Sequence, residues 1–281
     1  YNIETLWFNT GTLCNLSCKG CYIESSPTNK SLEYISYDSV KMYIQEIIKE
    51  GCGTKNIGFT GGEPFMNPEI IKMLQYILKL GFNVLVLSNG MRPIELKFKN
   101  LLELKDKENL TIRISIDHYT KVEHEKIRGR NTWDKLLKNL VWLENNGFNL
   151  NIACRIDERD TEKVAREKFQ KLFNKIKINI DASDSKKLIL FPNMDQNLTA
   201  TEITQECWKI LNKNPRSIMC SNSRMVVKKS NEIKTKVLAC TLITKDKNFE
   251  LGHRLMKSKK RVYLNHKFCS QFCVLGNSSC S

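Results

Sequence analysis

The sequence lacks the features that would direct it into or across a membrane. No run of apolar residues approaches the roughly 20 that a bilayer-spanning helix requires. The first residues do not show the basic, apolar and small-residue order of a secretory signal peptide. The chain also contains no internal repeat and no low-complexity tract. We therefore expect a cytoplasmic protein without a membrane partner.

Disulfide bonds are not expected either, although the chain is rich in cysteine. It has 11 cysteines among 281 residues, and disulfides are rare in reducing compartments. Most of these cysteines fall into two groups, at residues 14–21 and 220–280. Grouped cysteines without an export signal indicate metal binding. Cys52 and Cys154 lie apart from both groups, and we expect them to be buried structural residues.

The charge of the chain is strongly basic. Lysine and arginine outnumber aspartate and glutamate by 45 to 30, a formal net charge of +15, and many of the lysines fall in the last quarter. Such a field attracts nucleic acid or another anionic substrate. A solvated, lysine-rich surface whose charge is partly offset by metal-bound thiolates explains the same composition. Charge alone therefore does not distinguish these two explanations.

The first two thirds of the chain alternate short apolar runs with helix-period segments. Strands are expected near residues 6–10, 57–60, 84–87, 111–116, 150–154 and 188–191. Helices are expected between them, including one that begins with Pro68, is capped by Asn67 and ends before Gly81. Nearly continuous apolar strands predict a parallel sheet covered by helices. We therefore predict an α/β fold, a partial (βα)6 barrel over residues 1–197, followed by a small cysteine-rich extension over residues 198–281.

Three cysteines directly after the first predicted strand form the most informative motif. Cys14, Cys18 and Cys21 have the spacing CxxxCxxC. Soft thiolates suit zinc or iron–sulfur iron. A structural zinc site is closed by four ligands, whereas three cysteines leave one coordination position open for chemistry. The alternative for this motif is a zinc knuckle completed by a distant cysteine or histidine.

A second motif follows the next predicted strand and consists of Gly61, Gly62, Glu63 and Pro64. Glycines let the backbone approach a ligand closely, and a carboxylate can accept a hydrogen bond from an ammonium group. An ordinary Gly-Gly turn is the alternative. The position of the motif after a strand, about forty residues beyond the cysteines, favours a cofactor-binding turn.

Together the two motifs resemble those of the radical S-adenosylmethionine (SAM) superfamily. The resemblance implies that the three cysteines hold a [4Fe-4S] cluster, that SAM occupies its fourth iron, and that the GGEP segment holds the amino group of SAM. It places Tyr22 near the adenine, although Gly20 stands where members often carry an aromatic residue. An electron from a donor such as flavodoxin or ferredoxin would then cleave SAM to a 5′-deoxyadenosyl radical, which abstracts a hydrogen atom from the substrate.

Polar residues end the later predicted strands. Ser88 and Asn89 close one strand, and Ser115 and Asp117 close the next. Side chains alternate along a strand, so Ser115 and Asp117 point to the same face. We expect these four residues to hydrogen-bond SAM or the substrate, with turn and cap chemistry as the alternative.

Charged residues at the same strand ends are candidates for binding and proton transfer. Arg155 is expected to bind the carboxylate of SAM through a bidentate pair, with a surface ion pair as the alternative. Asp117 and His118 are candidate catalytic residues because both can exchange a proton. His124 has the same capacity, although loop histidines are more often solvated bystanders.

Five further cysteines lie near the end of the chain: Cys220, Cys240, Cys269, Cys273 and Cys280. The first two flank a predicted hairpin over residues 224–227 and 237–239. The layout resembles the SPASM/Twitch extensions, which bind one or two auxiliary [4Fe-4S] clusters. Four of the five would ligate one cluster, and the sequence leaves open which is spare. A zinc site or reduced, unliganded thiols are the alternatives.

These patterns predict a radical SAM enzyme that abstracts a hydrogen atom from a peptide or small-molecule substrate, assisted by an auxiliary cluster. One alternative is a radical SAM enzyme that modifies nucleic acid. Another, of a different class, is a zinc-bearing nucleic-acid-binding protein. That alternative leaves the GGEP motif and the barrel pattern unexplained.

Overall fold

The computed structural model describes residues 2–157, 159–195, 197–201, 203–276 and 278. Its strands form one sheet in the order β6-β5-β4-β3-β2-β1-β7-β8. All neighbours pair in parallel except β7 and β8, which are antiparallel. The strand bounds are β1 Thr5–Asn9, β2 Asn56–Thr60, β3 Asn83–Ser88, β4 Leu110–Ser115, β5 Asn149–Arg155, β6 Leu188–Phe191, β7 Ser223–Val227 and β8 Lys236–Leu238. The predicted parallel α/β fold is confirmed.

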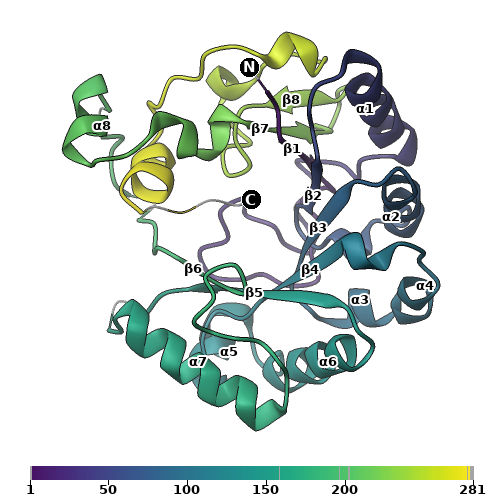
Figure 1. The fold of residues 1–281 in the computed structure, drawn as a ribbon, viewed down its shortest axis with the longest axis vertical. Helices are drawn as coiled ribbons and strands as arrows, with labels where there is room; N and C mark the ends of the chain where they lie inside the picture. Colours follow the sequence, from purple (N-terminus) through teal and green to yellow (C-terminus); the bar gives the residue numbers. More distant parts are fainter. Residues whose placement is uncertain (1, 158, 196, 202, 277, 279–281) are drawn as a thin grey trace.

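Helices cover the outer side of this sheet. Figure 1 shows the strands curving into an open ring, with α1, α2, α4, α6 and α7 outside it. The helix bounds are α1 Tyr37–Glu50, α2 Ile70–Lys79, α3 Arg92–Glu95, α4 Phe98–Leu102, α5 Lys121–Arg128, α6 Trp133–Asn145, α7 Glu162–Ile176 and α8 Gln205–Ile210. Within the described ranges, no helix combines the length and the apolarity that a membrane crossing requires.

The predicted start of α2 is wrong by two residues. The helix begins at Ile70 and not at Pro68. The side chain of Asn67 accepts a hydrogen bond from the backbone N–H of Glu69 at 2.9 Å and donates to the carbonyl of Ile35 at 2.9 Å. These two bonds hold residues 67–69 in a turn before the helix. Gly81 follows the helix with φ of 79°, as expected.

The two faces of the sheet pack against different partners. The outer face packs against the helices and forms the main apolar core, which includes Cys52 and Cys154 as expected. On the inner face, Trp7 packs in a smaller cluster with Met225 of β7 and Phe272 near the C-terminus. The segment around Phe272 therefore folds back against the inner face of the sheet.

The predicted C-terminal hairpin is present as β7 and β8. It is continuous with the core sheet, because β7 pairs with β1 from Thr5 opposite Ser223 to Phe8 opposite Val226. The division of the chain at residue 197 stays a prediction, since the two regions share this sheet. The shared sheet fixes Cys220 and Cys240, which flank the hairpin, relative to the barrel.

Candidate active site

A cavity of about 220 Å³ lies at the carboxyl ends of the strands. We call it the cysteine cavity. Eleven of the residues predicted for the site line it: Cys14, Cys18, Cys21, Tyr22, Gly61, Gly62, Ser88, Asn89, Ser115, Asp117 and Arg155. Glu63, Pro64 and His118 do not line it. The fold thus brings most of the predicted cofactor-binding residues to one place.

The loop that follows β1 carries the three cysteines of this cavity. Backbone N–H groups donate to two of the sulfurs, from Leu16 to Cys14 and from Ser25 to Cys21, each at 3.4 Å. Burial raises the pKa of the Cys14 thiol to about 12 and also raises that of Cys18. A buried thiolate needs a compensating positive charge. Metal binding would supply that charge and release the thiol protons.

The donor set of the cysteine cavity fits an iron–sulfur cluster. In the part of the chain that the structure describes, no three His, Cys, Asp or Glu side chains are grouped as ligands of a single metal ion. Three thiols around a shared cavity suit the larger [4Fe-4S] cluster, which is held by cysteine thiolates. With three of them, one iron remains open to another ligand.

The two glycines of the GGEP motif let this turn pack against the cysteine loop. The backbone N–H of Gly62 donates to the carbonyl of Gly11 at 2.8 Å. A Cβ atom on Gly62 would lie 2.1 Å from the carbonyl oxygen of Leu13. Gly61 has φ of 137°, a conformation that L side chains rarely adopt. Both positions therefore require glycine in this fold.

Glu63 links the turn after β2 to the end of β3 and does not line the cysteine cavity. Its carboxylate accepts hydrogen bonds from Ser88 Oγ at 3.0 Å, from the Asn89 N–H at 2.8 Å and from the Phe65 N–H at 3.1 Å. Burial raises the pKa of Glu63 to about 7, against the lowering effect of these bonds. The carboxylate thus ties the GGEP turn to β3, and its predicted contact with SAM stays a prediction.

Asp117 sits between two arginines at the wall of the cysteine cavity. Its carboxylate lies 2.7 Å from Arg128 Nε and 3.3 Å from Arg155 Nε. Burial opposes ionisation of Asp117, but the two guanidinium charges outweigh it and lower its pKa to about 2. An ionised carboxylate has no proton to donate near neutral pH. The arrangement suits a positioning role better than the predicted acid–base role.

Arg155 connects Asp117 to the cysteine loop. Its guanidinium donates to the carbonyls of Lys19 at 3.1 Å and Gly20 at 3.3 Å. These contacts occupy part of the guanidinium that we expected to bind the SAM carboxylate. The loop between Cys18 and Cys21 is thereby fixed to the end of β5.

His118 lies outside the cysteine cavity. Its Nδ1 accepts a hydrogen bond from the backbone N–H of Thr120 at 2.9 Å, and its Nε2 lies 3.7 Å from the Asp157 carboxylate. Burial lowers the pKa of His118. The His118 ring therefore stabilises the turn before α5. The structure does not bring it to the cysteine cavity, where the chemistry is expected.

Arg128 is a site residue whose role the sequence did not reveal. It lies at the end of α5, lines the cysteine cavity and pairs with Asp117. In the sequence, Arg128 followed by Gly129 indicates only a turn. Asp117 follows β4, Arg128 ends α5 and Arg155 ends β5, so the three charged residues come from separate parts of the chain and no local pattern signals their pairing.

Four of the five C-terminal cysteines surround a second, small cavity of about 20 Å³, which we call the C-terminal cavity. They are Cys220, Cys240, Cys269 and Cys273, and the other lining residues are apolar. Burial raises the pKa of Cys220 to about 12 and that of Cys269 to about 11. Four thiols without a lining carboxylate fit a soft metal centre such as an iron–sulfur cluster. Cys280 lies outside the described residues, and ligation by these cysteines stays a prediction.

The two cysteine sites are in direct contact. The ring of Tyr22, the residue after Cys21, packs edge-on against Phe268, the residue before Cys269, with centroids 6.0 Å apart.

A third cavity of about 500 Å³, the outer cavity, opens beside them. It is lined by Gly20, Tyr22, Arg155, Asn193, Met194, Asp195, Leu198 and Gln271. The first three also line the cysteine cavity, so the outer cavity adjoins it.

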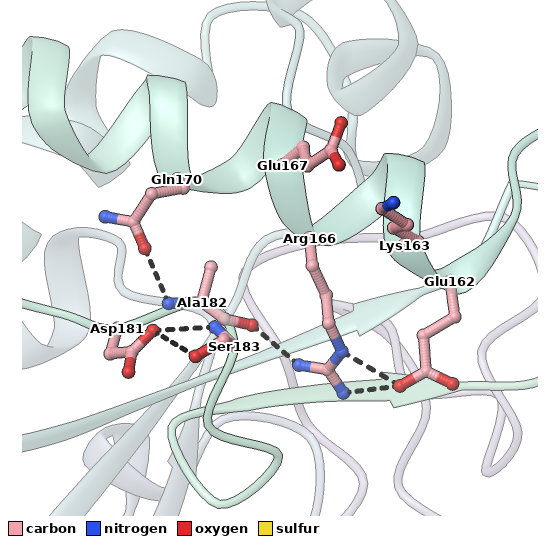
Figure 2. Close-up of a pocket in the computed structure, with 8 residues that line it drawn as sticks. All are labelled: Glu162, Lys163, Arg166, Glu167, Gln170, Asp181, Ala182 and Ser183. Carbon is pink, nitrogen blue, oxygen red and sulfur yellow. Dashed lines mark hydrogen bonds and ion pairs between the residues drawn. The ribbon is translucent and has the colours of Figure 1, made fainter.

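A hollow of about 640 Å³, larger than the cysteine cavity, lies elsewhere, along α7 (Figure 2). The polar side chains that line it bond to one another and to the loop 181–183, and they hold that loop against the helix. Arg166 pairs with Glu162 and donates to the carbonyl of Ala182, while Gln170 accepts from the N–H of Ala182. None of the predicted site residues lines this hollow. It is a structural crevice.

Known proteins with related sequences or folds include a bacteriocin biosynthesis protein and a protein solved with SAM bound. The chain is 32% identical over 154 residues to the antilisterial bacteriocin subtilosin biosynthesis protein AlbA of Bacillus subtilis (strain 168), covering 54% of this chain and 33% of AlbA. The crystal structure of Streptococcus suis SuiB bound to S-adenosylmethionine has a TM-score of 0.62 at 12% identity, covering 93% of this chain and 65% of that one.

SuiB has also been solved bound to its precursor peptide SuiA, with a TM-score of 0.52 at 15% identity, covering 63% of this chain and 38% of that one. The chain thus spans about a third of AlbA, and the likeness to SuiB shows the fold alone. The family model of the Radical SAM superfamily matches residues 8–162, more than half of the chain. The chain belongs to the radical SAM superfamily, whose members are enzymes that use a [4Fe-4S] cluster and SAM.

Proposed function

We propose that this chain cleaves SAM reductively and abstracts a hydrogen atom from a peptide. The observation that carries the proposal is that Cys14, Cys18 and Cys21 line one cavity together with Gly61 and Gly62. When bound, the cluster and SAM supply the one-electron cleavage that yields a 5′-deoxyadenosyl radical. The electron would come from a donor such as flavodoxin or ferredoxin, in the cytoplasm.

The chain's own residues would hold and enclose these cofactors. The three thiols bind the cluster, and the two glycines allow SAM to approach the backbone. Arg155 keeps the cysteine loop in place through the carbonyls of Lys19 and Gly20. Arg155 and Arg128, both held by Asp117, would put positive charge beside the SAM carboxylate. Leu16, Leu87 and Phe191 also line the cavity and limit the access of water to it.

A peptide is the substrate class that we favour over a small molecule. AlbA takes part in bacteriocin biosynthesis, and SuiB binds a precursor peptide. The outer cavity offers a wide approach with apolar and polar lining, including Met194, Leu198 and Gln271. A peptide segment in this cavity would place one side chain toward the cysteine cavity. A nucleic-acid substrate rests only on the net charge of +15.

We further propose that the C-terminal cavity holds an auxiliary [4Fe-4S] cluster ligated by Cys220, Cys240, Cys269 and Cys273. Hydrogen abstraction leaves a substrate radical. Its conversion to a closed-shell product would release one electron and one proton; the cluster held by these four cysteines would accept the electron, and the proton would pass to solvent. A zinc-bearing nucleic-acid-binding protein, by contrast, would leave membership of the radical SAM superfamily unexplained.

The catalytic proposal is tested by measuring 5′-deoxyadenosine after anaerobic reconstitution with iron, sulfide, SAM and dithionite. We expect the nucleoside from the wild type and none above background from Cys18→Ala. Nucleoside at wild-type levels from Cys18→Ala would refute the proposal.

The peptide proposal is tested with short peptides encoded beside the gene, by following loss of hydrogen in the mass spectrum. Leu198→Glu in the outer cavity is expected to raise the KM for an accepted peptide several-fold. Leu102→Glu, at another exposed leucine on α4 and outside the outer cavity, is the matched control and is expected to leave it unchanged. Equal KM values for the two variants would contradict binding in the outer cavity.

A further inference from the structure

Lys213 makes an unusual contact with the segment that carries two of the C-terminal cysteines. That segment, Cys269–Val274, is a π-helical turn. The ammonium of Lys213 donates to the carbonyl oxygens of Cys273 at 2.5 Å and Val274 at 2.8 Å. The last carbonyls of a helical turn lack partners within it, and a cation there satisfies them and opposes the partial negative charge.

The backbone around Lys213 holds its side chain in this direction. Lys213 follows α8, and its N–H donates to the carbonyl of Trp208 at 2.9 Å across Asn212, whose φ is 46°. This left-handed residue with a bond back into the helix is a helix-ending motif. No residue of α8 is fully buried, and only Cys207 and Trp208 are half-buried, so apolar packing holds this helix weakly. The two bonds of Lys213 fasten this end of α8 to the π-helical turn.

A second cation makes a similar contact with another cysteine of the C-terminal cavity. Arg224 Nη1 donates to the carbonyl of Cys220 at 2.7 Å. Two of the four cysteines of this cavity thus have their backbone carbonyls held by a positively charged side chain. The cavity itself is lined by thiols and apolar groups, and a nearby charge acts strongly in such a weakly polar surrounding.

We propose that Lys213 is a positioning residue that raises the reduction potential of the auxiliary cluster. The proposal rests on the auxiliary cluster proposed above. Reduction adds a negative charge to the cluster, and an adjacent ammonium stabilises that reduced form. Net charge and hydrogen bonding around a cluster are known determinants of its potential. A higher potential makes the cluster a better acceptor of the electron released by the substrate radical.

The test uses full-length protein with Cys14, Cys18 and Cys21 all changed to Ala, so that only the C-terminal cluster remains. Its potential is measured by redox titration followed by electron paramagnetic resonance. Lys213→Met is expected to lower the reduced-to-oxidised ratio at fixed potential on the order of tenfold, which is about 59 mV for a one-electron couple. Lys213→Arg keeps the charge and is expected to keep the potential. Lys209→Met, on the exposed side of α8, is the matched control.

Iron content, measured on the same samples, separates the possible failures. An unchanged potential in Lys213→Met at full iron content overturns the role of Lys213 and leaves the cluster in place. A reduced iron content with an unchanged potential also overturns it, because it assigns Lys213 a structural role only. If the parent variant binds no iron, the proposed auxiliary cluster is refuted, and the inference about Lys213 with it.

Discussion

Asp117→Asn is expected to destabilise the protein strongly, because it removes the negative charge that pairs with two largely buried arginines. The Asp117 side chain is 5% exposed, and those of Arg128 and Arg155 are 11% and 19% exposed. Removing one partner of a buried ion pair costs about 3–5 kcal/mol. Lowering of the Asp117 pKa from 3.8 to about 2 corresponds to about 2.5 kcal/mol. We expect a loss of roughly 2–5 kcal/mol in the free energy of unfolding.

The pH dependence of this loss follows from the direction of the pKa shift. The folded-state pKa of Asp117 is lowered, so its contribution is present above the unfolded-state pKa of 3.8 and is lost as the pH falls toward about 2. The stability difference between wild type and Asp117→Asn should be constant from about pH 5 to pH 8 and shrink below about pH 4.

The assay is urea unfolding of the anaerobically purified protein at several pH values, followed by circular dichroism. Asp134→Asn is the matched control, since Asp134 forms an exposed pair with Lys121 at 2.6 Å and such pairs contribute about 0–1 kcal/mol. Equal stability of Asp117→Asn and Asp134→Asn at pH 7 would refute the ion-pair argument. A difference that grows toward acid pH would refute the assigned pKa direction.

Three further outcomes follow from the site. Gly62→Ala should abolish cluster assembly, measured as iron content, because its Cβ would meet the Leu13 carbonyl at 2.1 Å; normal iron content would contradict the packing argument. Burial raises the pKa of Glu63 to about 7, so the stability that Glu63 contributes is lost as the pH rises from about 4.5 through 7. The urea midpoint of the wild type should therefore fall over this range, and that of Glu63→Gln should fall less. Parallel pH profiles of the two proteins would contradict this pKa direction. Cys240→Ser should lower iron by about four per monomer while Cys207→Ala, which lies outside both cysteine cavities, should not; an equal effect of the two would count against the auxiliary cluster.

The parallel sheet could be predicted from the sequence because its signals are local. Continuous apolar strands, the helix caps and the spacing of Cys14, Cys18 and Cys21 each occupy a short stretch of chain. The start of α2 was predicted wrongly because the side chain of Asn67 also bonds the carbonyl of Ile35, a residue distant in sequence. Local capping rules do not contain such a partner.

Residues of the site that depend on distant partners could not be placed from the sequence. Glu63 follows a strand end, as a ligand-binding carboxylate would, yet its oxygens accept from Ser88 and Asn89 of the neighbouring strand. Arg128 carries no local signal beyond a turn, and only the fold brings it to Asp117. The pairing of β7 with β1 likewise joins residues more than 200 positions apart.

The central claim is that Cys14, Cys18 and Cys21 hold the cluster that cleaves SAM, separately from the C-terminal cysteines. The most direct measurement is iron and acid-labile sulfide per monomer after anaerobic reconstitution, for the wild type and for the variant with all three changed to Ala. We predict about eight irons falling to about four. A fall from about four to none would remove the auxiliary cluster from the account. Iron content that is unchanged in the triple variant would contradict the central claim.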